Sequence, residues 1–443
     1  MDYIVILLTK LLGKVTALLG GGTNLPGEIA LKLRPQILKK LSMGYQIVLV
    51  TGTNGKTTTV SMLQSILRRT GKRAIGSTSG ANLKSGVATC LIQNFPLLHK
   101  VKGDYAVLEV DEAYMRHVTE DIKPAVIAVT NIFRDQLDRY GEIDITLSLI
   151  EEACKKSPDT TLVLNGDEAM LGDFVPENKH FYYGFNTALD AAHHSATNVE
   201  GKHCKKCKTP YAYDFVTFNH LGAYCCPKCG FKRPALSLAV EEITEITADS
   251  SSVKAGLLTL TIPQAGVYNI YNALCAAACA RVLGMQDEDI REGIAGQACK
   301  FGRQETVPIK NALLRIILIK NPAGAEQAIA SVLPDKTPVY LGVMLNDRYA
   351  DGTDVSWIYD VEFEKLRSMQ AKGLLIGGTR AYDMGIRMKV AGFEKPEIHL
   401  TYEEMLTAIE GIEGRIYMFM TYTAMTGFRK FLYNKKYIKK LWF

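Results

Sequence analysis

The sequence lacks an uninterrupted apolar stretch of the length that crosses a lipid bilayer. Its apolar start, Ile4 to Leu19, is broken by Lys10 and Lys14, and the three glycines that follow do not form a signal-peptide cleavage site. We therefore expect a cytoplasmic protein whose first segment is an amphipathic helix. This helix is expected to pack on its own domain, and the alternative is that it rests on the inner face of the cell membrane.

The sequence also lacks an unusually high or low content of hydrophobic, charged or proline residues. The hydrophobic fraction is 47%, the charged fraction is 22% and there are 15 prolines, which excludes a mostly disordered chain. The sequence has no internal repeat and no low-complexity linker. The formal net charge of +6 is small for 443 residues, but basic residues gather between Arg429 and Lys440 among aromatic ones. We interpret them as a solvated helix end, with an anionic membrane surface or an acidic partner as the alternative.

Without an export signal, the ten cysteines are expected to be reduced. Four of them form two C-x-x-C pairs, Cys204 with Cys207 and Cys226 with Cys229, separated by 18 residues. Two such pairs supply four thiolates for a tetrahedral zinc ion. Because four sulfur ligands leave no open position, we predict a structural zinc ribbon inserted at about residues 194–234. A nucleic-acid ribbon is the competing interpretation, but no base-reading module accompanies it, so no nucleic-acid partner is expected.

The rest of the chain alternates between strand and helix patterns, which indicates an α/β protein with a parallel sheet covered on both faces. Apolar strand patterns occupy residues 46–50, 106–110, 125–129 and 161–164, and a second series occupies 314–319, 339–345, 374–376 and 416–420. The length suggests about three domains. We predict an N-terminal helical segment (1–45), a central ATP-binding domain (46–305) and a C-terminal Rossmann-like α/β domain (306–443).

A glycine-rich loop, TGTNGKTTT, stands between the first strand pattern and a helix pattern. Glycines let backbone amides approach phosphate oxygens, the helix N-terminus adds positive potential, a lysine reaches the outer phosphates and a threonine hydroxyl can bind Mg²⁺. The usual Walker spacing would place a glycine at position 50, where this chain has Val50. We predict a variant phosphate-binding loop for ATP, formed by Gly52, Thr53, Asn54, Gly55, Lys56, Thr57 and Thr58.

This variant loop resembles that of Mur ligases and folylpolyglutamate synthetases. The resemblance implies that Glu109, which ends a later strand pattern, binds magnesium together with Thr57. In the string TNIFRDQLDRYGEID it assigns Asn131, Asp135 and Asp138 to the asparagine and the acidic helix start that follow the next strand in this family.

The same resemblance implies an adenine-side helix at YNIYNALCAAACA, with Asn269 and Asn272 as candidates for ATP binding. It also implies that Arg303, in FGRQE, is the linker arginine that contacts ATP. One position departs from the family pattern. Gln136 stands where the amino-acid-adding members carry a metal-binding histidine, which leaves the number of magnesium ions open.

Carboxylates crowd the loop that follows the 339–345 strand pattern, and the carboxyl ends of strands are where the sites of α/β folds gather. These carboxylates belong to Asp347, Asp351, Asp354 and Asp360. The inserted zinc ribbon and the strings RDQLDRYGEID, KNPAG and ADGTDVSWIYD together resemble the MurT family, the synthetase subunits of lipid II isoglutaminyl synthase. The resemblance covers nearly the whole chain.

That resemblance implies a carbon–nitrogen ligase of peptidoglycan synthesis, which amidates the α-carboxylate of D-glutamate in lipid II through an acyl phosphate. Lys56, Glu109 and Asp354 are its expected catalytic residues. Because no cysteine lies in a recognisable nucleophile-elbow context, ammonia is expected from a GatD-type glutamine amidotransferase in a heterodimer. Asp354 is expected to orient the partner's catalytic histidine, or else to cap a helix. Asp351 precedes Gly352 and is interpreted as a turn residue.

Two other classes of function remain open from the residues alone. An amino-acid-adding Mur or folylpolyglutamate-type ligase would use the same ATP site with an amino acid as the nucleophile. A zinc module with a regulatory nucleotide site would bind ATP without turnover. Gln136 and the cysteine pairs argue against the first class, and release of ADP in the presence of lipid II and glutamine would exclude the second.

Overall fold

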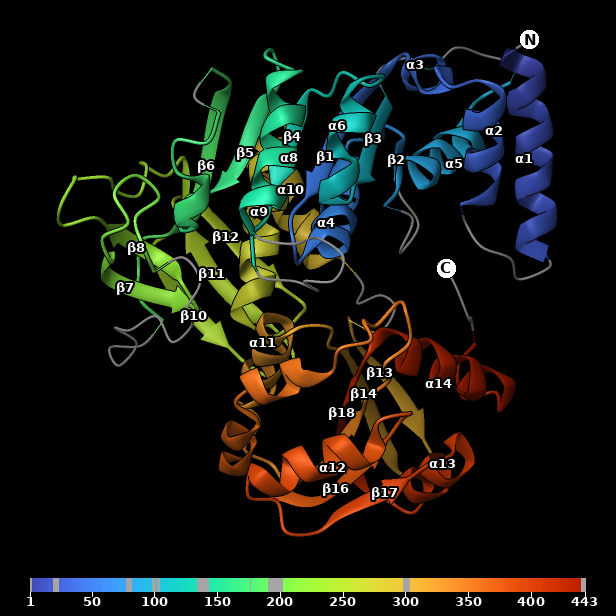
Figure 1. Cartoon of the computed structure of the whole chain (residues 1–443), viewed down its shortest axis with the longest axis vertical. Helices are drawn as coiled ribbons and strands as arrows, with labels where there is room; N and C mark the ends of the chain where they lie inside the picture. Colours follow the sequence, from blue (N-terminus) through green and yellow to red (C-terminus); the bar gives the residue numbers. More distant parts are fainter. Residues whose placement is uncertain are drawn as a thin grey trace. The chain divides into compact units, whose positions relative to one another are not determined.

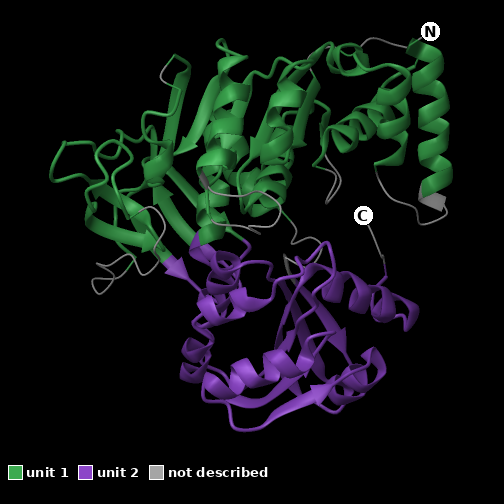
Figure 2. Ribbon diagram, viewed as in Figure 1, with its two compact units in different colours: residues 1–244, 252–262, 268–297 green, residues 245–251, 263–267, 298–443 purple. Residues whose placement is uncertain are grey.

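The computed structural model describes residues 2–18, 24–76, 82–97, 101, 104–133, 143–175, 177–189, 202–297 and 303–439. The chain divides into two compact units (Figures 1 and 2). Unit 1 comprises residues 1–244, 252–262 and 268–297, and unit 2 comprises residues 245–251, 263–267 and 298–443. The residues that begin the chain, up to the first strand, therefore belong to unit 1.

Unit 1 is built on a seven-stranded sheet in the order β2-β3-β1-β4-β5-β6-β9, and every neighbouring pair in it is parallel. The strands are β1 (Tyr45–Thr51), β2 (Ala74–Gly76), β3 (Asp104–Glu109), β4 (Val126–Val129), β5 (Thr161–Asn165), β6 (Lys179–Phe185) and β9 (Leu238–Val240). The apolar run of β1 is buried on both faces, as expected for a strand inside a parallel sheet. The expected α/β fold with a parallel sheet is thus confirmed.

Helices surround this sheet (Figure 1). They are α1 (Asp2–Leu18), α2 (Leu25–Leu33), α3 (Ile37–Ser42), α4 (Lys56–Arg69), α5 (Lys84–Asn94), α6 (Met115–Thr119), α8 (Ile143–Lys155), α9 (Val267–Val282) and α10 (Asp287–Ala295), with short 3₁₀ helices η1 (Glu112–Tyr114) and η2 (Ala169–Leu171). On one face, Ile47 and Leu49 of β1 join a buried apolar cluster with Val118 of α6 and Ile150 of α8. None of the described helices is both long enough and apolar enough to span a membrane.

Two smaller β structures are separate from the parallel sheet. β7 (Ala212–Phe218) and β8 (Leu221–Cys225) form an antiparallel hairpin beside the cysteine pairs. β10 (Glu242–Ile246), β11 (Ser251–Ala255) and β12 (Leu258–Ile262) form a three-stranded sheet.

Unit 2 contains a six-stranded sheet in the order β13-β14-β18-β15-β16-β17, in which only the pair β13–β14 is antiparallel. Its strands are β13 (Arg303–Ile309), β14 (Ala312–Leu318), β15 (Val339–Met344), β16 (Ala371–Gly377), β17 (Pro396–His399) and β18 (Gly414–Met420). Its helices are α11 (Pro322–Val332), α12 (Ala381–Val390), α13 (Tyr402–Glu410) and α14 (Tyr422–Asn434), with 3₁₀ helices η3 (Ser356–Asp360) and η4 (Phe363–Ser368).

Alternate residues of β18 enter two different apolar cores, because successive side chains of a strand point to opposite faces of the sheet. Tyr417 and Phe419 join one cluster, whereas Ile416 and Met418 join the other. One expectation for unit 2 is wrong in part. Arg429 is not in a solvated helix end, since its side chain is 4% exposed and pairs with Glu305 at 2.5 Å.

A buried polar cluster joins the parallel sheet to the hairpin and to α9. The carboxylate of Asp167 is fully buried and accepts hydrogen bonds from the Tyr271 hydroxyl at 2.7 Å, Arg233 Nη1 at 2.8 Å and the Phe185 amide at 2.9 Å. The Tyr271 hydroxyl also bonds to Thr217 of β7 at 2.5 Å. A buried carboxylate is tolerated only when its lone pairs are satisfied in this way, so these contacts fix α9 against the hairpin.

We predict that Asp167→Ala lowers the free energy of unfolding by about 3 kcal/mol, because it leaves the Arg233 charge and two other donors without their acceptor. The measurement is chemical or thermal denaturation of the purified chain. Glu242→Ala is the matched control, since it removes one partner of an exposed ion pair with Lys254 and should cost below about 1 kcal/mol. Equal stability of the two variants would contradict the prediction.

Candidate functional site

The glycine-rich loop connects the end of β1 to the start of α4, as the sequence predicts. Gly52 and Gly55 adopt φ values of +116° and +86°, a region that favours glycine. A Cβ atom at position 52 would lie 2.4 Å from the Thr130 hydroxyl oxygen, and one at position 55 would lie 2.0 Å from Asn272 Oδ1. Both positions therefore require glycine on conformational and on steric grounds.

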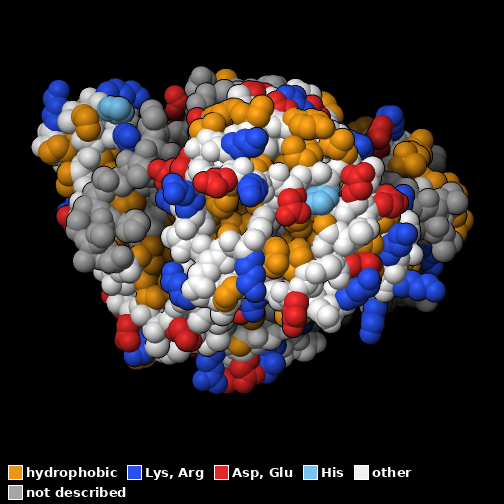
Figure 3. All heavy atoms as spheres, turned by 90° about the horizontal axis from the view of Figure 1, so that it is seen from below, with side chains coloured by type: hydrophobic (Ala, Val, Ile, Leu, Met, Phe, Trp, Pro, Cys, Tyr) orange, Lys and Arg blue, Asp and Glu red, His pale blue; other side chains and the backbone are white. Residues whose placement is uncertain are grey.

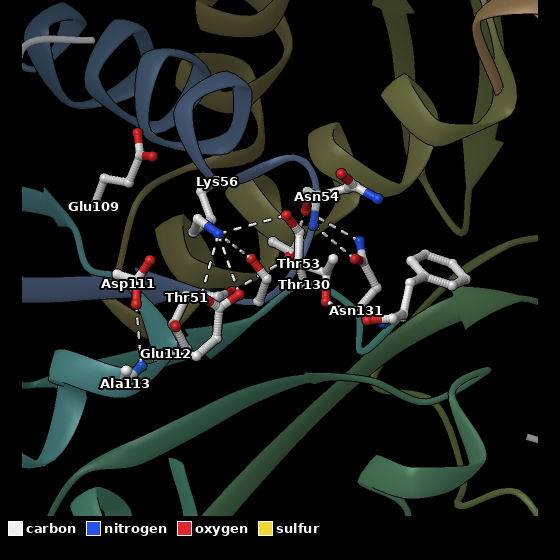
Figure 4. Close-up of polar contacts among 12 residues, drawn as sticks. Thr51, Thr53, Asn54, Lys56, Glu109, Asp111, Glu112, Ala113, Thr130 and Asn131 are labelled. Atoms are coloured by element: carbon white, nitrogen blue, oxygen red, sulfur yellow. Dashed lines mark hydrogen bonds and ion pairs between the residues drawn. The ribbon is translucent and has the colours of Figure 1, made fainter. Parts of the chain in front are cut away.

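The residues that follow β4 hold this loop from one side (Figure 4). The Asn131 side chain accepts from the Asn54 amide at 2.9 Å and donates to the Asn54 carbonyl at 3.1 Å. Thr130 donates to the same carbonyl at 2.7 Å, and the Thr53 amide donates to the Asn131 carbonyl at 3.0 Å. These bonds hold the backbone of Thr53 and Asn54 in one conformation, so residues that follow β4 set the shape of the loop.

Lys56 is the cation of the site. Its Nζ atom donates to the Gly52 carbonyl at 2.6 Å and lies 3.1 Å from Oε1 of Glu112 (Figure 4). The side chains of Lys56 and Glu112 are only 11% and 7% exposed. A nearly buried ammonium requires an anionic partner, and Glu112 provides one for Lys56 beside the loop.

Sequence reasoning missed Glu112. The signal was present, because Glu109, Asp111 and Glu112 follow one another at the carboxyl end of β3, which lies next to β1 in the sheet. In a parallel sheet this edge collects functional side chains. The Asp111 carboxylate accepts from the Ala113 amide at 3.2 Å and caps η1.

The two residues expected to bind magnesium lie together. The Thr57 hydroxyl donates to Oε2 of Glu109 at 2.5 Å, and Glu109 is 5% exposed. A hydroxyl and a carboxylate are the hard oxygen ligands that Mg²⁺ prefers beside nucleotide phosphates. The two side chains therefore fit a shared magnesium ion.

The helix α9 brings Asn272 against the loop. Asn269 and Asn272 are 3% and 4% exposed, and the Asn272 amide donates to Asn269 Oδ1 at 3.2 Å. Arg303 begins β13 of unit 2, but its side chain lies outside the described part of the structure. Three further positions of the family pattern also lie outside the described residues, and these are Asp135, Gln136 and Asp138.

The four predicted cysteine ligands converge on one point. Sulfur atoms of Cys204, Cys207, Cys226 and Cys229 all lie within 4.8 Å of one another, with 3.5 Å between Cys204 and Cys229 and 3.4 Å between Cys207 and Cys226. This spacing fits one tetrahedral ion with four sulfur ligands. Cys225 is exposed and stands outside the cluster.

The acidities of these thiols fit a cation as well. Hydrogen bonds to the side chain and backbone of Thr209 lower the pKa of Cys207 to about 6. A backbone hydrogen bond from Phe231 lowers the pKa of Cys229, but desolvation and hydrogen bonds with the other three sulfurs raise this pKa to about 12. Four thiols this close cannot all ionise unless a cation balances their charge, which is the condition that a metal ion supplies.

The hairpin next to the cysteines is tied to the sheet by a second buried contact. His220 Nε2 and Glu168 Oε2 lie 2.9 Å apart, and both side chains are almost fully buried. The same Glu168 oxygen accepts from the Ile132 amide at 3.4 Å. Since Ile132 follows the loop-holding Asn131, the hairpin and the phosphate loop share one rigid polar network.

In unit 2, two carboxylates of the acidic loop have different surroundings. Asp351 is 4% exposed and accepts from the Thr423 amide at 2.7 Å, so it caps the start of α14. Burial raises the pKa of Asp351. Asp354 is exposed, and the Ser356 amide donates to its carboxylate at 2.8 Å. This backbone hydrogen bond lowers the pKa of Asp354, which is therefore ionised at neutral pH.

Comparisons with known proteins agree with this geometry. Residues 50–280 match the Mur ligase middle domain family, and residues 318–425 match the MurT ligase C-terminal family. Among solved structures, a pseudomurein peptide ligase type C from Methanothermus fervidus has a TM-score of 0.69 at 21% identity, covering 91% of this chain and 81% of that one. A MurF from Acinetobacter baumannii has a TM-score of 0.67 at 17% identity, covering 93% and 80%. The chain thus has the Mur ligase fold.

A closer relationship is visible in whole sequences. The protein of Streptococcus pneumoniae (strain ATCC BAA-255 / R6) named "Lipid II isoglutaminyl synthase (glutamine-hydrolyzing) subunit MurT" is 38% identical over 429 residues, which is 96% of each chain. The protein of the same name from Staphylococcus aureus (strain COL) is 34% identical over 397 residues, 88% of each chain. The chain belongs to the MurT family.

We predict that Lys56→Met lowers the rate of ADP formation by about 100-fold or more, because it removes the cation that the loop pattern assigns to the outer phosphates of ATP. A coupled assay of ADP release measures this rate. Lys84→Met is the matched control, since Lys84 also pairs with a carboxylate, that of Asp121 at 2.8 Å, but lies outside the loop. Retained ADP formation in Lys56→Met would show that the loop does not serve ATP.

We predict that replacing any one of Cys204, Cys207, Cys226 or Cys229 by Ser lowers bound metal and thermal stability, because apparent binding energies of structural zinc reach roughly 10–16 kcal/mol in small modules. Elemental analysis and thermal denaturation give the two readouts. Cys225→Ser is the matched control and should retain both. Purified protein without any metal would contradict the assignment.

Proposed function

We propose that this chain is the synthetase subunit of a lipid II isoglutaminyl synthase and amidates the α-carboxylate of D-glutamate in the lipid II stem peptide. One observation carries the proposal. A complete phosphate loop, with Lys56 and Glu112 paired at its mouth, occurs in a chain that aligns with MurT proteins along almost its whole length. The name of those relatives describes a subunit of a glutamine-hydrolysing lipid II isoglutaminyl synthase, and we extend that activity to this chain.

The proposed reaction has two steps. A carboxylate oxygen of the substrate attacks the γ-phosphorus of ATP, which forms an acyl phosphate and releases ADP. Ammonia then attacks the acyl carbon, phosphate leaves with the bonding electrons, and the nitrogen loses one proton to give the amide, D-isoglutamine. Negative charge on the transferring phosphoryl group is largest in the first step, and the Lys56 ammonium is the residue of this chain that opposes it.

Ligand roles follow from the same site. Thr57 and Glu109 would hold magnesium, which when bound neutralises phosphate charge. Gly52 to Thr58 would bind the phosphates, and Asn269 and Asn272 would flank the nucleotide on the α9 side. A buried Asn54 side-chain nitrogen has no hydrogen-bond partner among the described residues, and phosphate or substrate oxygen would satisfy it. The metal at the four cysteines is zinc in this proposal, and its role is structural.

We further propose that ammonia reaches this chain from a GatD-type glutamine amidotransferase bound to unit 2. Figure 3 views the molecule from below, and apolar side chains lie exposed between charged ones on the face that it draws. Exposed apolar residues of unit 2 include Tyr349, Tyr359, Tyr382, Ile386 and Val390. Exposed aromatic residues are enriched at protein interfaces, which supports a partner that binds unit 2.

Asp354 is the proposed link between the two subunits. Its ionised, exposed carboxylate can accept a hydrogen bond from the Nδ1–H of a partner histidine and hold that ring in the tautomer needed for catalysis. Asp351 is buried under the start of α14 and is committed to Thr423, which argues against the same role. Since lipid II is lipid-linked, we also propose that the complex works at the inner face of the cell membrane.

An amino-acid-adding Mur ligase is the second candidate, because its ATP site would use the same residues. The nucleophile separates the two, since the first candidate requires ammonia and the second requires an amino acid. Amide formation from lipid II, ATP and ammonium chloride, detected by mass spectrometry, supports the first. Product that forms only when an amino acid is supplied would refute it.

We predict that Asp354→Asn, in the complex with its amidotransferase, lowers glutamine-dependent amidation by up to about four orders of magnitude, the effect of the corresponding change in a serine protease. Amidation driven by added ammonium chloride should remain unchanged, because Lys56 and Glu109 are intact. The measurement is amidated lipid II formed per minute with either nitrogen source.

Asp351→Asn is the matched control for that experiment. It replaces a carboxylate three positions away and should lower thermal stability, through the weakened cap on α14, without separating the two nitrogen sources. If Asp354→Asn reduces both activities equally, Asp354 belongs to the ATP or substrate site and not to the subunit interface.

A further inference from the structure

The first helix of unit 1, α1, has apolar residues on its exposed side as well as on its packed side. Its apolar residues Val5 and Ile6 are buried together with Thr9 and Gly13, as expected for the packed side. The opposite side is also apolar and faces outward. Its exposed residues are Tyr3 (55%), Ile4 (59%), Leu7 (53%), Leu8 (57%), Leu11 (61%) and Val15 (45%).

The spacing of these residues makes them one continuous surface. Positions 3 and 4, 7 and 8, 11 and 15 recur at intervals of three and four, so they line one face of an α-helix over three turns. We call these six residues the α1 outer face. A water-exposed helix places polar residues on this side, and an exposed apolar stripe of this length marks an interaction surface.

The packed side fixes the orientation of α1. A Cβ atom on Gly13 would lie 3.3 Å from Gln93 Nε2 of α5 and 3.4 Å from Pro26 Cγ of α2, so the helix fits closely against both neighbours. The nitrogen Nζ of Lys10 adds a 2.6 Å hydrogen bond to the carbonyl of Phe95, beyond the end of α5. The helix therefore cannot bury its outer face by rotating, and Figure 1 shows it at the edge of unit 1 beside α2.

Charge around the α1 outer face is positive. Residues 1–45 contain six basic side chains and two acidic ones, Asp2 and Glu28, and both acids are already paired, with Arg34 at 3.4 Å and with Lys32 at 2.8 Å. Lys14 is exposed on the outer side of α1, and Lys40 of α3 lies 4.7 Å from the centre of the Tyr3 ring. Leu33 at the end of α2 and Met43 after α3 are exposed apolar residues as well.

We propose that the α1 outer face binds the surface of a bilayer that contains anionic lipids, with the helix lying parallel to the membrane plane. Aliphatic side chains at the centre would enter the boundary of the acyl chains, and the lysines and Tyr3 at the rim would remain at the headgroups. The positive rim matches an anionic surface, to which each nearby lysine adds attraction. Membrane binding by the α1 outer face would hold unit 1 where a lipid-linked substrate resides. This inference rests on the proposed function.

The test is sedimentation of the full chain with phosphatidylglycerol–phosphatidylcholine vesicles. Wild-type protein should sediment with these vesicles, sediment less with pure phosphatidylcholine, and be released as salt rises. Leu7→Glu with Leu11→Glu should lower vesicle binding at least tenfold. The control pair is Ile145→Glu with Leu257→Glu, which adds the same charge at exposed positions of α8 and of the turn before β12 and should bind as the wild type does.

Amidation assays distinguish a failure of the membrane-binding proposal from a failure of the proposed reaction. In detergent micelles, the Leu7/Leu11 variant should amidate lipid II at the wild-type rate, whereas on vesicles its rate should fall with its binding. Two outcomes would overturn the proposal: wild-type protein that stays in the supernatant with anionic vesicles, or a wild-type dimer that the Leu7/Leu11 variant converts to a monomer, which would assign the face to a second copy. Loss of amidation in micelles by the wild type would instead refute the reaction.

Discussion

The site of unit 1 depends on the placement of one positive charge, that of Lys56, at the point where β1 turns into α4. The ammonium is almost withdrawn from water, and it is tolerated because the Gly52 carbonyl and the Glu112 carboxylate accept from it. Its position also requires a loop without side chains at 52 and 55, where a Cβ would meet Thr130 and Asn272. The position of the Lys56 ammonium thus depends on the close packing of the loop around Gly52 and Gly55.

The rigidity of this loop comes from side chains that approach from elsewhere in the sequence. Asn131 and Thr130 hold the Asn54 backbone, and the next residue, Ile132, donates to the carboxylate of Glu168, which also pairs with His220. The cysteine module is therefore anchored in the network that shapes the phosphate loop. In the proposed function, a metal ion at the four cysteines would therefore stabilise a module that is in contact with this network.

Prediction from the sequence succeeded where local pattern and local chemistry coincide. The strand, loop and α4 were predictable, because Val60, Leu63, Ile66 and Leu67 recur at helical spacing and are all buried. The clustering of the two C-x-x-C pairs was also predictable, because their spacing is that of a four-sulfur site. Glu112 and the Asp167 cluster escaped prediction, since their partners are 56, 18, 66 and 104 positions away in the chain. Nothing in a local window indicates that such residues meet.

The sequence by itself determined the type of fold, the glycine-rich loop between a strand and a helix, the two cysteine pairs that come together and the likeness to the MurT family, because each depends on residue types at fixed spacing along the chain. Tertiary structure alone decided which carboxylate faces Lys56, that Asp351 is committed to α14 while Asp354 is exposed, and which side of α1 remains uncovered. Each of these features depends on which side chains are buried away from water. Burial depends on the packing of distant elements, and a linear pattern does not specify it.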